Sequence, residues 1–404
     1  MVALMAVANL SPIIGFTRYP ELFRSIIAGL ESYERSIPCV GGSIHLTYFD
    51  NLAYDGKALT EVAKPVKEQP PSSFDAFRDR MVRQLRHLFS NAADDARARA
   101  FIPLTTVSTG YDSTTVSALA IAAGATDSIT IANSRSGDID SGEPIAKHLG
   151  LSCTEVSREA WRQETDCESI FLSSDAKGED VYFAGFGDKL AGRLLLTGYC
   201  GTRVLKTRAG LSFNFERTDQ SGLSHTEARL HLGYVHCPAL FIAGRDTQSL
   251  RHISLSDEMR PWDIGGDYSS PIARRLLEEA GVPREMFGMK KQAASVLIQD
   301  RREFLSERSK ENYARWFEEN FARSGRLRER LRSLQVDAVA QLARVLTWSA
   351  AIGHRVLPLP ILRRIANSVR LNELAHRDPR FDHLFAWSVQ KTVKRYRTGP
   401  SEGV

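Results

Sequence analysis

The sequence contains no long apolar run and no closely paired cysteines. None of its 404 residues lies in an uninterrupted apolar stretch that approaches the ~18 residues needed to cross a bilayer, so we expect no membrane association. Five cysteines are scattered along the chain: Cys39, Cys153, Cys167, Cys200 and Cys237. None forms a Cys-x-x-Cys pair, which argues against a zinc ribbon. An odd, scattered set is typical of a reducing compartment, so we expect a cytoplasmic protein.

The sequence also has no marked excess of charge of either sign. Its formal net charge is +5 at pH 7, which suits a small anionic substrate but is too small to indicate nucleic-acid binding. The apolar first sixteen residues have no charged leader and no clear cleavage site, so we expect them to belong to the fold. A hydrophobic content of 43% is typical of a soluble globular protein, and 404 residues suit two or three domains.

The most informative stretch extends from Leu104 to Ala120, where a β-branched segment leads through a short polar turn into an apolar helix. Gly110 allows the chain to fold back sharply in the turn. Four hydroxyl side chains lie beside the unpaired N–H groups expected at the helix start: Ser108, Thr109, Ser113 and Thr114. Such a helix start attracts phosphate or pyrophosphate. Asp112 either caps the helix or holds a metal ion against phosphate oxygens.

This turn, Ser108-Thr109-Gly110-Tyr111-Asp112-Ser113, resembles the Ser-Gly-Gly-x-Asp-Ser pyrophosphate loop of the ATP pyrophosphatases, with Thr109 in place of the first glycine. The chain is similar in particular to the asparagine synthetases and β-lactam synthetases of the PP-loop (adenine nucleotide alpha hydrolase) superfamily. The resemblance implies that these six residues bind the pyrophosphate of ATP and that Asp112 holds Mg²⁺. No Gly-Lys-Ser/Thr follows, so the turn is not the other common phosphate loop.

Strands and helices alternate around this turn, which predicts an α/β fold with a doubly wound parallel sheet. We expect the first strand to begin at Leu104, because Pro103 cannot donate to a sheet. Further strands are expected at 128–132, 153–156 and 193–197, with a short helix around Ile145 to Leu151. By resemblance, the backbone that follows the second strand holds adenine, a role that falls to Ile131, Ala132 and Asn133. The acids of the next loop, Asp138, Asp140 and Glu143, are either solvated or bind metal or substrate.

The strand at 193–197 ends in a second motif that is only half kept. The family has Ser-Gly-acid-Gly-x-Asp-Glu here, whose acids hold magnesium and pyrophosphate, whereas this chain keeps Thr197-Gly198 and has Tyr199, Thr202 and Arg203 where acids are expected. Three explanations stay open. Magnesium is held by Asp112 and other acids, Arg203 and Lys206 replace the charge of the metal, or catalysis has been lost.

Several later segments are candidates for the same site. The glycine-rich stretch 161–188 is expected to be a lid or a substrate loop. Residues 244–246 and 257–262 are expected to face the cleft. His225, His231 and His236 lack metal-ligand spacing and are expected to be structural or substrate contacts. The segment 287–293 resembles a lysine-bearing loop that reaches the reacting phosphate, which makes Lys291, and after it Lys290, the candidate catalytic lysines.

We divide the chain into a small N-terminal α+β region (1–71), a PP-loop synthetase domain (72–295) and a helical, basic C-terminal region (296–404). The first region is expected to contain a strand at 43–49 and a hairpin turn at 54–57. Asparagine synthetases carry a glutaminase domain whose nucleophilic cysteine follows the initiator methionine. Here that position is Val2, so we expect no glutaminase activity. The basic C-terminal region is either a solvated surface or binds a partner protein or RNA.

The implied function is that of a cytoplasmic, AMP-forming ligase with ATP and Mg²⁺ as cofactors. It would adenylate a small carboxylate-type substrate, release pyrophosphate, and pass the acyl group to a nitrogen donor to form an amide bond. One alternative is a nucleobase- or tRNA-modifying enzyme of the same superfamily, although nucleic-acid binding is not expected. Another is a degenerate nucleotide-binding partner protein without turnover.

Overall fold

The computed structural model describes residues 1–205, 222–296, 304–321, 326–356, 361, 365 and 383–398, except 15, 17, 24, 30–31, 49, 65–68, 267 and 291. For Arg203, 326–337 and 354–356 it describes the backbone but not the side chains. Lys206 and Lys291, named above as candidates, therefore lie outside the described residues. Within this part of the chain, no helix combines the length and apolar character that a membrane span requires.

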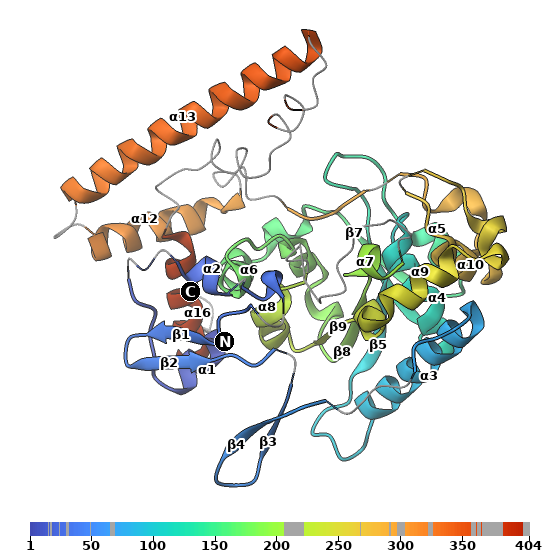
Figure 1. The fold of residues 1–404 in the computed structure, drawn as a ribbon. Helices are drawn as coiled ribbons and strands as arrows, with labels where there is room; N and C mark the ends of the chain where they lie inside the picture. Colours follow the sequence, from blue (N-terminus) through green and yellow to red (C-terminus); the bar gives the residue numbers. More distant parts are fainter. Residues whose placement is uncertain are drawn as a thin grey trace.

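The centre of the molecule is a five-stranded parallel sheet (Figure 1). Its strands are β5 (Ile102–Thr106), β6 (Asp127–Ile131), β7 (Ser152–Val156), β8 (Arg193–Thr197) and β9 (Val235–Pro238), in the spatial order β7-β6-β5-β8-β9. All four strand pairs are parallel. The prediction of an α/β protein with a parallel sheet is therefore confirmed, and the arrangement is compatible with a doubly wound fold.

The first strand of the sheet begins two residues earlier than expected. Pro103 lies inside β5, opposite Leu194 of β8. The pairing of β5 with β6 begins only at Thr105, so Pro103 precedes that ladder, where its missing N–H group costs no hydrogen bond. The prediction that the strand starts at Leu104 was wrong for this reason.

Apolar side chains pack on both faces of the sheet, because successive residues of a strand point to opposite sides. Leu194 and Leu196 belong to a core cluster formed with α3 (Phe74–Ala92), α4 (Tyr111–Ala123), α5 (Glu143–His148), α9 (Thr247–Ser254) and α10 (Pro271–Glu279). Leu195 belongs to a second cluster, formed with α6 (Cys167–Asp175), η3 (Val181–Lys189), α8 (His225–Leu232) and α12 (Glu307–Phe321). Two helical layers thus leave the ends of the strands accessible.

The segment 161–188 forms part of the core and is not a lid. It folds into the end of η2 (Ala160–Gln163), α6 and most of η3, and all nine residues of α6 are buried. Its serines do not prevent this burial, because Ser173 and Ser174 donate hydrogen bonds back to the carbonyl oxygen of Ile170. The lid prediction was therefore wrong, although Glu179 and Asp180 contribute to the cavity described below.

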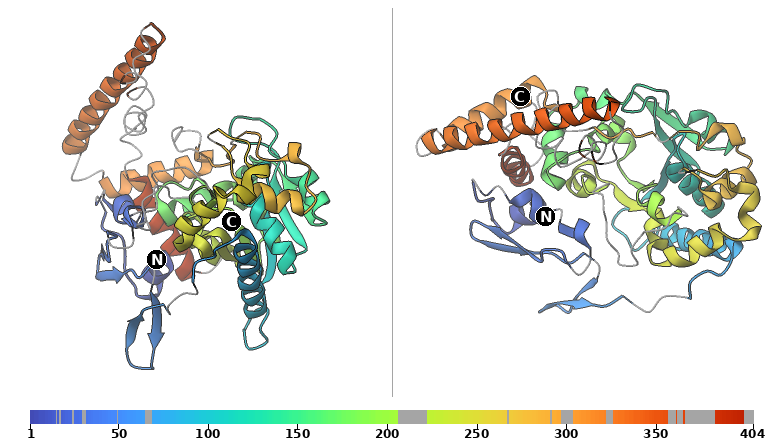
Figure 2. Two further views of the ribbon diagram at one scale, coloured as in Figure 1. Left: turned by 45° about the vertical axis from the view of Figure 1, so that its right-hand side comes forward. Right: turned by 45° about the horizontal axis from the view of Figure 1, so that its top comes forward.

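The two ends of the described chain pack together (Figure 2). Val2, Met5 and Ile37 share a core cluster with Phe385 and Val389 of α16 (Leu384–Thr398). The other elements of the N-terminal part are α1 (Val2–Val7), α2 (Tyr19–Phe23), η1 (Ser25–Ala28) and two hairpins, β1 (Ser36–Cys39) with β2 (Gly42–His45) and β3 (Asn51–Tyr54) with β4 (Leu59–Val62). The turn predicted at 54–57 is confirmed, whereas the strand predicted at 43–49 ends at His45.

Five shorter or peripheral elements complete the described fold. They are α7 (Gly201–Leu205), η4 (Ala239–Asp246), η5 (Asp257–Trp262), η6 (Arg284–Met286) and α13 (Arg326–Val356). In Figure 1, α13 lies at the outer edge of the molecule, next to α12.

Candidate functional site

A cavity of about 280 Å³ opens at the carboxyl ends of the parallel strands. Its walls are the turn between β5 and α4, the end of β6, the start of η3, the loop after β8, and the segment 292–295. After β5 the chain forms β6 and β7 on one side of that strand, and it then returns to form β8 on the other side. Parallel α/β sheets bind ligands at this kind of switch point, so the cavity lies where a ligand is expected.

The predicted phosphate-binding turn forms the floor of the cavity. The hydroxyls of Ser108 and Ser113 are hydrogen-bonded at 2.7 Å, and the N–H group of Gly110 donates to Ser108 Oγ at 3.2 Å. Gly110 is the N-cap of α4, and as a glycine it makes no side-chain cap hydrogen bond. The first turn of α4 therefore presents a partial positive charge at the cavity, which favours an anion. Ser108, Gly110, Tyr111, Asp112 and Ser113 all line it.

The half-kept motif after β8 packs directly against this turn. A Cβ atom added to Gly198 would lie 2.3 Å from the backbone nitrogen of Ser113, and one added to Gly201 would lie 2.5 Å from Cγ of Asp112. Only glycine permits so close an approach. Thr202 uses the contact to donate a 3.0 Å hydrogen bond to the Asp112 carboxylate. The structure therefore brings together the two motifs that the sequence separates by about 90 residues.

Of the three acids left open in the loop after β6, only Asp140 lines the cavity. Its carboxylate accepts hydrogen bonds from the N–H group of Thr109 (3.2 Å) and from the Thr109 hydroxyl (2.6 Å). Burial raises the pKa of Asp140 above its ordinary value. Glu143 lies in the first turn of α5, outside the lining residues. Asp138 instead pairs with Lys290 at 2.6 Å, and this ion pair lowers the pKa of Asp138.

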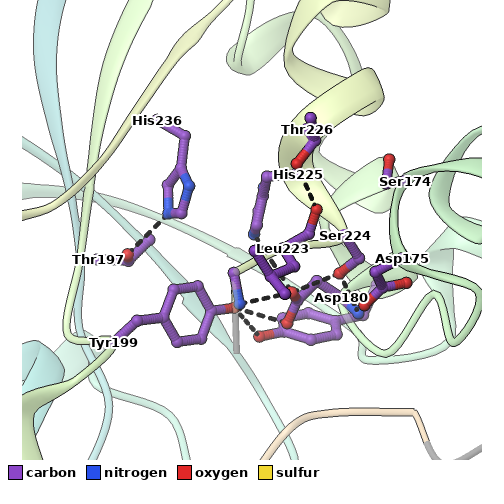
Figure 3. Close-up of polar contacts among 12 residues, drawn as sticks. Ser174, Asp175, Asp180, Thr197, Tyr199, Leu223, Ser224, His225, Thr226 and His236 are labelled. Carbon is purple, nitrogen blue, oxygen red and sulfur yellow. Dashed lines mark hydrogen bonds and ion pairs between the residues drawn. The ribbon is translucent and has the colours of Figure 1, made fainter. Parts of the chain in front are cut away.

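A buried polar network forms another wall (Figure 3). The carboxylate of Asp180 accepts hydrogen bonds from the hydroxyls of Tyr199 (2.6 Å) and Ser224, and from the N–H group of Gly222 (3.2 Å). Burial raises the pKa of Asp180 and raises that of Tyr199 well above its usual range. Burial lowers the pKa of His225 to about 3, so this ring is neutral at physiological pH. The carboxylate of Asp180 thus accepts its hydrogen bonds from neutral donors.

The histidines of this wall are structural, as one of the two sequence interpretations held. Nδ1 of His225 is hydrogen-bonded to the Tyr234 hydroxyl at 2.6 Å, and the His225 ring stacks on that of His236. Nε2 of His236 is hydrogen-bonded to the hydroxyl of Thr197 at 2.9 Å (Figure 3). Among the described residues there is no group of three or more histidine, cysteine, aspartate or glutamate side chains placed to hold a metal ion.

Only one of the three predicted adenine-binding residues lines the cavity. Ile131 lines the cavity, together with the aromatic side chains of Phe183 and Phe186. Ala132 and Asn133 do not line it. The N–H group of Ala132 donates to the carbonyl oxygen of Val156, and its carbonyl accepts from the N–H group of Asp140. The apolar end of the cavity therefore begins where β6 ends.

We refer to the segment Gly288–Val296, of which Lys291 lies outside the described residues, as the strap. Its ends are anchored by backbone hydrogen bonds, from the Gly288 N–H group to the carbonyl oxygen of Thr109 (2.8 Å) and from the Val296 N–H group to that of Glu179 (2.8 Å). Arg158 donates to the carbonyl oxygens of residues 294 and 295. Gln292, Ala293, Ala294 and Ser295 line the cavity, whereas Lys290 is on the exposed side with Asp138.

The cavity lining is acidic. It contains the four carboxylates of Asp112, Asp140, Glu179 and Asp180, and the lining residues in the described part of the chain include no lysine, arginine or histidine. A polyphosphate in such a cavity requires cations to offset the repulsion. Mg²⁺ keeps several waters and uses one or two carboxylates together with phosphate oxygens, so Asp112 beside the anion-binding turn fits this ion without a larger ligand cluster.

Some predicted residues lie elsewhere, and two important ones were missed. Residues 244–246 and 257–262 do not line the cavity, and Asp246 instead forms an ion pair with Arg80 of α3. Asp180 and Gln292 belong to segments that the sequence analysis considered, but neither was predicted as a site residue, although both line the cavity. Neither has a local motif, since Asp180 precedes a short irregular helix and Gln292 lies in a segment without regular structure.

The sheet and its cavity define an α/β protein with a candidate ligand site at the carboxyl edge of a parallel sheet. The sequence matches no family model, and it matches no curated protein.

Proposed function

We propose that this chain is an asparagine synthetase-like, AMP-forming ligase with a doubly wound PP-loop domain that uses ATP and Mg²⁺. One observation carries the proposal. The turn Ser108–Ser113, with its resemblance to a pyrophosphate loop, lies at the uncapped start of α4, inside a cavity at the switch point of the sheet. The pyrophosphate of ATP would bind the N–H groups and hydroxyls of this turn, and Asp112 would hold Mg²⁺ against its oxygens.

The proposed reaction has two steps. A carboxylate oxygen of the substrate attacks the α-phosphorus of ATP, the bond between the α-phosphorus and its bridging oxygen breaks, and pyrophosphate leaves. A nitrogen nucleophile then attacks the acyl carbon, AMP leaves, and an amide forms. The helix start and the bound magnesium would stabilise the charge that develops on pyrophosphate.

A second candidate function is nucleotide binding without turnover. It is favoured by the wall after β8, where Tyr199 and Thr202 stand in place of the acids of the family motif and are hydrogen-bonded to Asp180 and Asp112. Asp112 and Asp180 are thus engaged with neutral protein groups, an arrangement that also suits a nucleotide-binding partner protein.

The two candidates are separated by measuring binding and turnover on the same preparation. Calorimetry with ATP and Mg²⁺ tests binding. Pyrophosphate release is then followed with a panel of amino-, hydroxy- and dicarboxylic acids and with ammonium as the nitrogen donor. Carboxylate-dependent release supports the ligase, whereas ATP binding without release by any member of the panel supports the nucleotide-binding protein. Absence of ATP binding would contradict both.

A further inference from the structure

Gln292 of the strap carries a buried acceptor for which the described residues supply no hydrogen-bond partner. Its Nε2 donates a 3.2 Å hydrogen bond to the carbonyl oxygen of Ile139. A carbonyl oxygen only accepts, so this bond fixes the orientation of the amide and makes Oε1 the remaining atom. Oε1 is buried and has no hydrogen-bond partner among the described residues. Buried acceptors are rarely left in this state, so the position indicates a partner that the described residues do not supply.

The strap holds this amide at the end of β6. Ile139, the acceptor of the Gln292 amide, forms an isolated bridge with Asn133, two residues after the strand ends. The next strap residue, Ala293, accepts a 2.7 Å hydrogen bond from the N–H group of Arg135. Gln292 is therefore fixed against the loop that follows Ile131, and both residues line the cavity.

The lining of the cavity indicates the shape of the missing partner. Besides Ile131 it includes Ile129, Phe183 and Phe186, which offer apolar and aromatic surface to a flat ring. The turn Ser108–Ser113, which suits phosphate, lines the same cavity. A planar heterocycle with an N–H donor on its edge would fit the apolar surface beside Gln292, and an attached phosphate chain would fit the turn.

We infer that Gln292 reads the base of the bound nucleotide, with Oε1 accepting a hydrogen bond from the exocyclic 6-amino group of adenine. This inference rests on the proposed nucleotide site, and it explains how that site would distinguish one base from another. A 6-oxo purine presents an acceptor to Oε1, so guanine nucleotides are disfavoured. Gln292 is thus a specificity-determining residue, although it lies about 160 residues further along the chain than the strand β6 that it faces.

The test compares three nucleotides in the presence of Mg²⁺ by calorimetry on the full chain. They are ATP, purine riboside 5′-triphosphate, which has hydrogen in place of the 6-amino group, and GTP. Loss of one hydrogen bond between neutral groups lowers affinity about 3- to 10-fold, so the wild type should prefer ATP over purine riboside triphosphate by that factor. GTP should bind more weakly still.

The variant Gln292→Met removes the acceptor and keeps a side chain of similar length. It should bind ATP and purine riboside triphosphate equally. Because it also loses the contact with Ile139, the matched control is Arg158→Ala, which removes the contacts to the carbonyl oxygens of residues 294 and 295. Loosening the strap in this way should weaken both nucleotides alike and preserve their ratio.

The outcomes separate the inference from the proposed function. A preference for ATP that persists in Gln292→Met, or equal binding of ATP and purine riboside triphosphate by the wild type, would overturn the role of Gln292 and leave the nucleotide site intact. If the wild type binds none of the three nucleotides, the proposed function fails and the inference fails with it.

Discussion

The hydroxyl of Tyr199 donates a 2.6 Å hydrogen bond to the carboxylate of Asp180, and both side chains line the cavity. Tyr199 follows β8, where the related motif has an acid, and Asp180 comes from the beginning of η3. A carboxylate therefore lies at this wall although the loop after β8 carries none at that position. The acids of the site must therefore be identified from the three-dimensional structure and not from the sequence motif alone.

Asp112→Asn should weaken magnesium-dependent ATP binding by about tenfold or more and leave the fold intact. The physical reason is the loss of a charged oxygen ligand beside the anion-binding turn, since interactions with a charged group contribute about 1.5–3 kcal/mol. Calorimetry with ATP and Mg²⁺ measures the effect, and the exposed Asp257→Asn is the matched control. Equal affinity in Asp112→Asn and the wild type would remove Asp112 from the site.

Gly198→Ala should disrupt the contact between the loop after β8 and the start of α4. Its Cβ would meet backbone atoms of Asp112 and Ser113 at 2.3–2.4 Å, so the loops must separate. Overpacking of this kind costs about 1–3 kcal/mol of unfolding free energy, and we expect ATP affinity to fall more than tenfold.

The control for this change is Gly265→Ala, where a Cβ meets nothing within 4 Å but the positive φ of +70° introduces strain. That variant should lose about 1 kcal/mol of stability and keep its ATP affinity. Denaturant unfolding and calorimetry measure the two quantities. If Gly198→Ala binds ATP as tightly as Gly265→Ala, the two loops do not form one nucleotide site.

Asp175 should make stability depend on pH. Burial raises the pKa of Asp175 from 3.8 to about 7. A carboxyl group with the higher pKa in the folded state binds protons preferentially there, so its contribution favours folding at low pH and is lost as the pH rises from about 4 to 7. Asp175→Asn removes this titration. Its free energy of unfolding should therefore rise relative to the wild type between pH 5 and 7, by at most about 3 kcal/mol, since one proton changes it by about 1.4 kcal/mol per pH unit.

Denaturant unfolding at pH 5, 6, 7 and 8 provides the measurement for Asp175, with Asp257→Asn as a control whose difference from the wild type stays flat. A constant difference between Asp175→Asn and the wild type across this range would contradict the assignment.

The strap lysines should differ in their effect on turnover. Lys290 is 65% exposed and pairs with Asp138, and water screens the interaction of such an exposed pair. We expect Lys290→Ala to change the rate of pyrophosphate release by less than about fivefold. We expect the same of Asp138→Ala, which removes the other member of the ion pair. Lys291→Ala should lower this rate about a hundredfold with ATP affinity nearly unchanged, because it would act on charge that develops in the transition state. Wild-type rates in both lysine variants would show that the strap has no catalytic lysine.

Local sequence signals predicted much of the central fold. The β-branched residues before Gly110 and the apolar run after Asp112 predicted β5, the turn and α4, because strand, turn and helix preferences are set by neighbouring residues. The alternation of such segments predicted the parallel sheet. The boundary at Pro103 was missed, since whether a proline is tolerated depends on which neighbouring strand is paired at that residue.

What the sequence by itself determined is the strand–turn–helix unit around Gly110 and the strands β6, β7 and β8 that follow it along the chain, because these follow from short-range chemistry. It did not predict β9 or the order of the strands in the sheet. What only the tertiary structure decided is the composition of the cavity. Asp180 meets Tyr199 and Ser224, and Gln292 meets Ile139, across separations of 19 to 153 residues. Such contacts are fixed by how the helices and the strap pack on the sheet, and no pattern in the neighbouring residues encodes them.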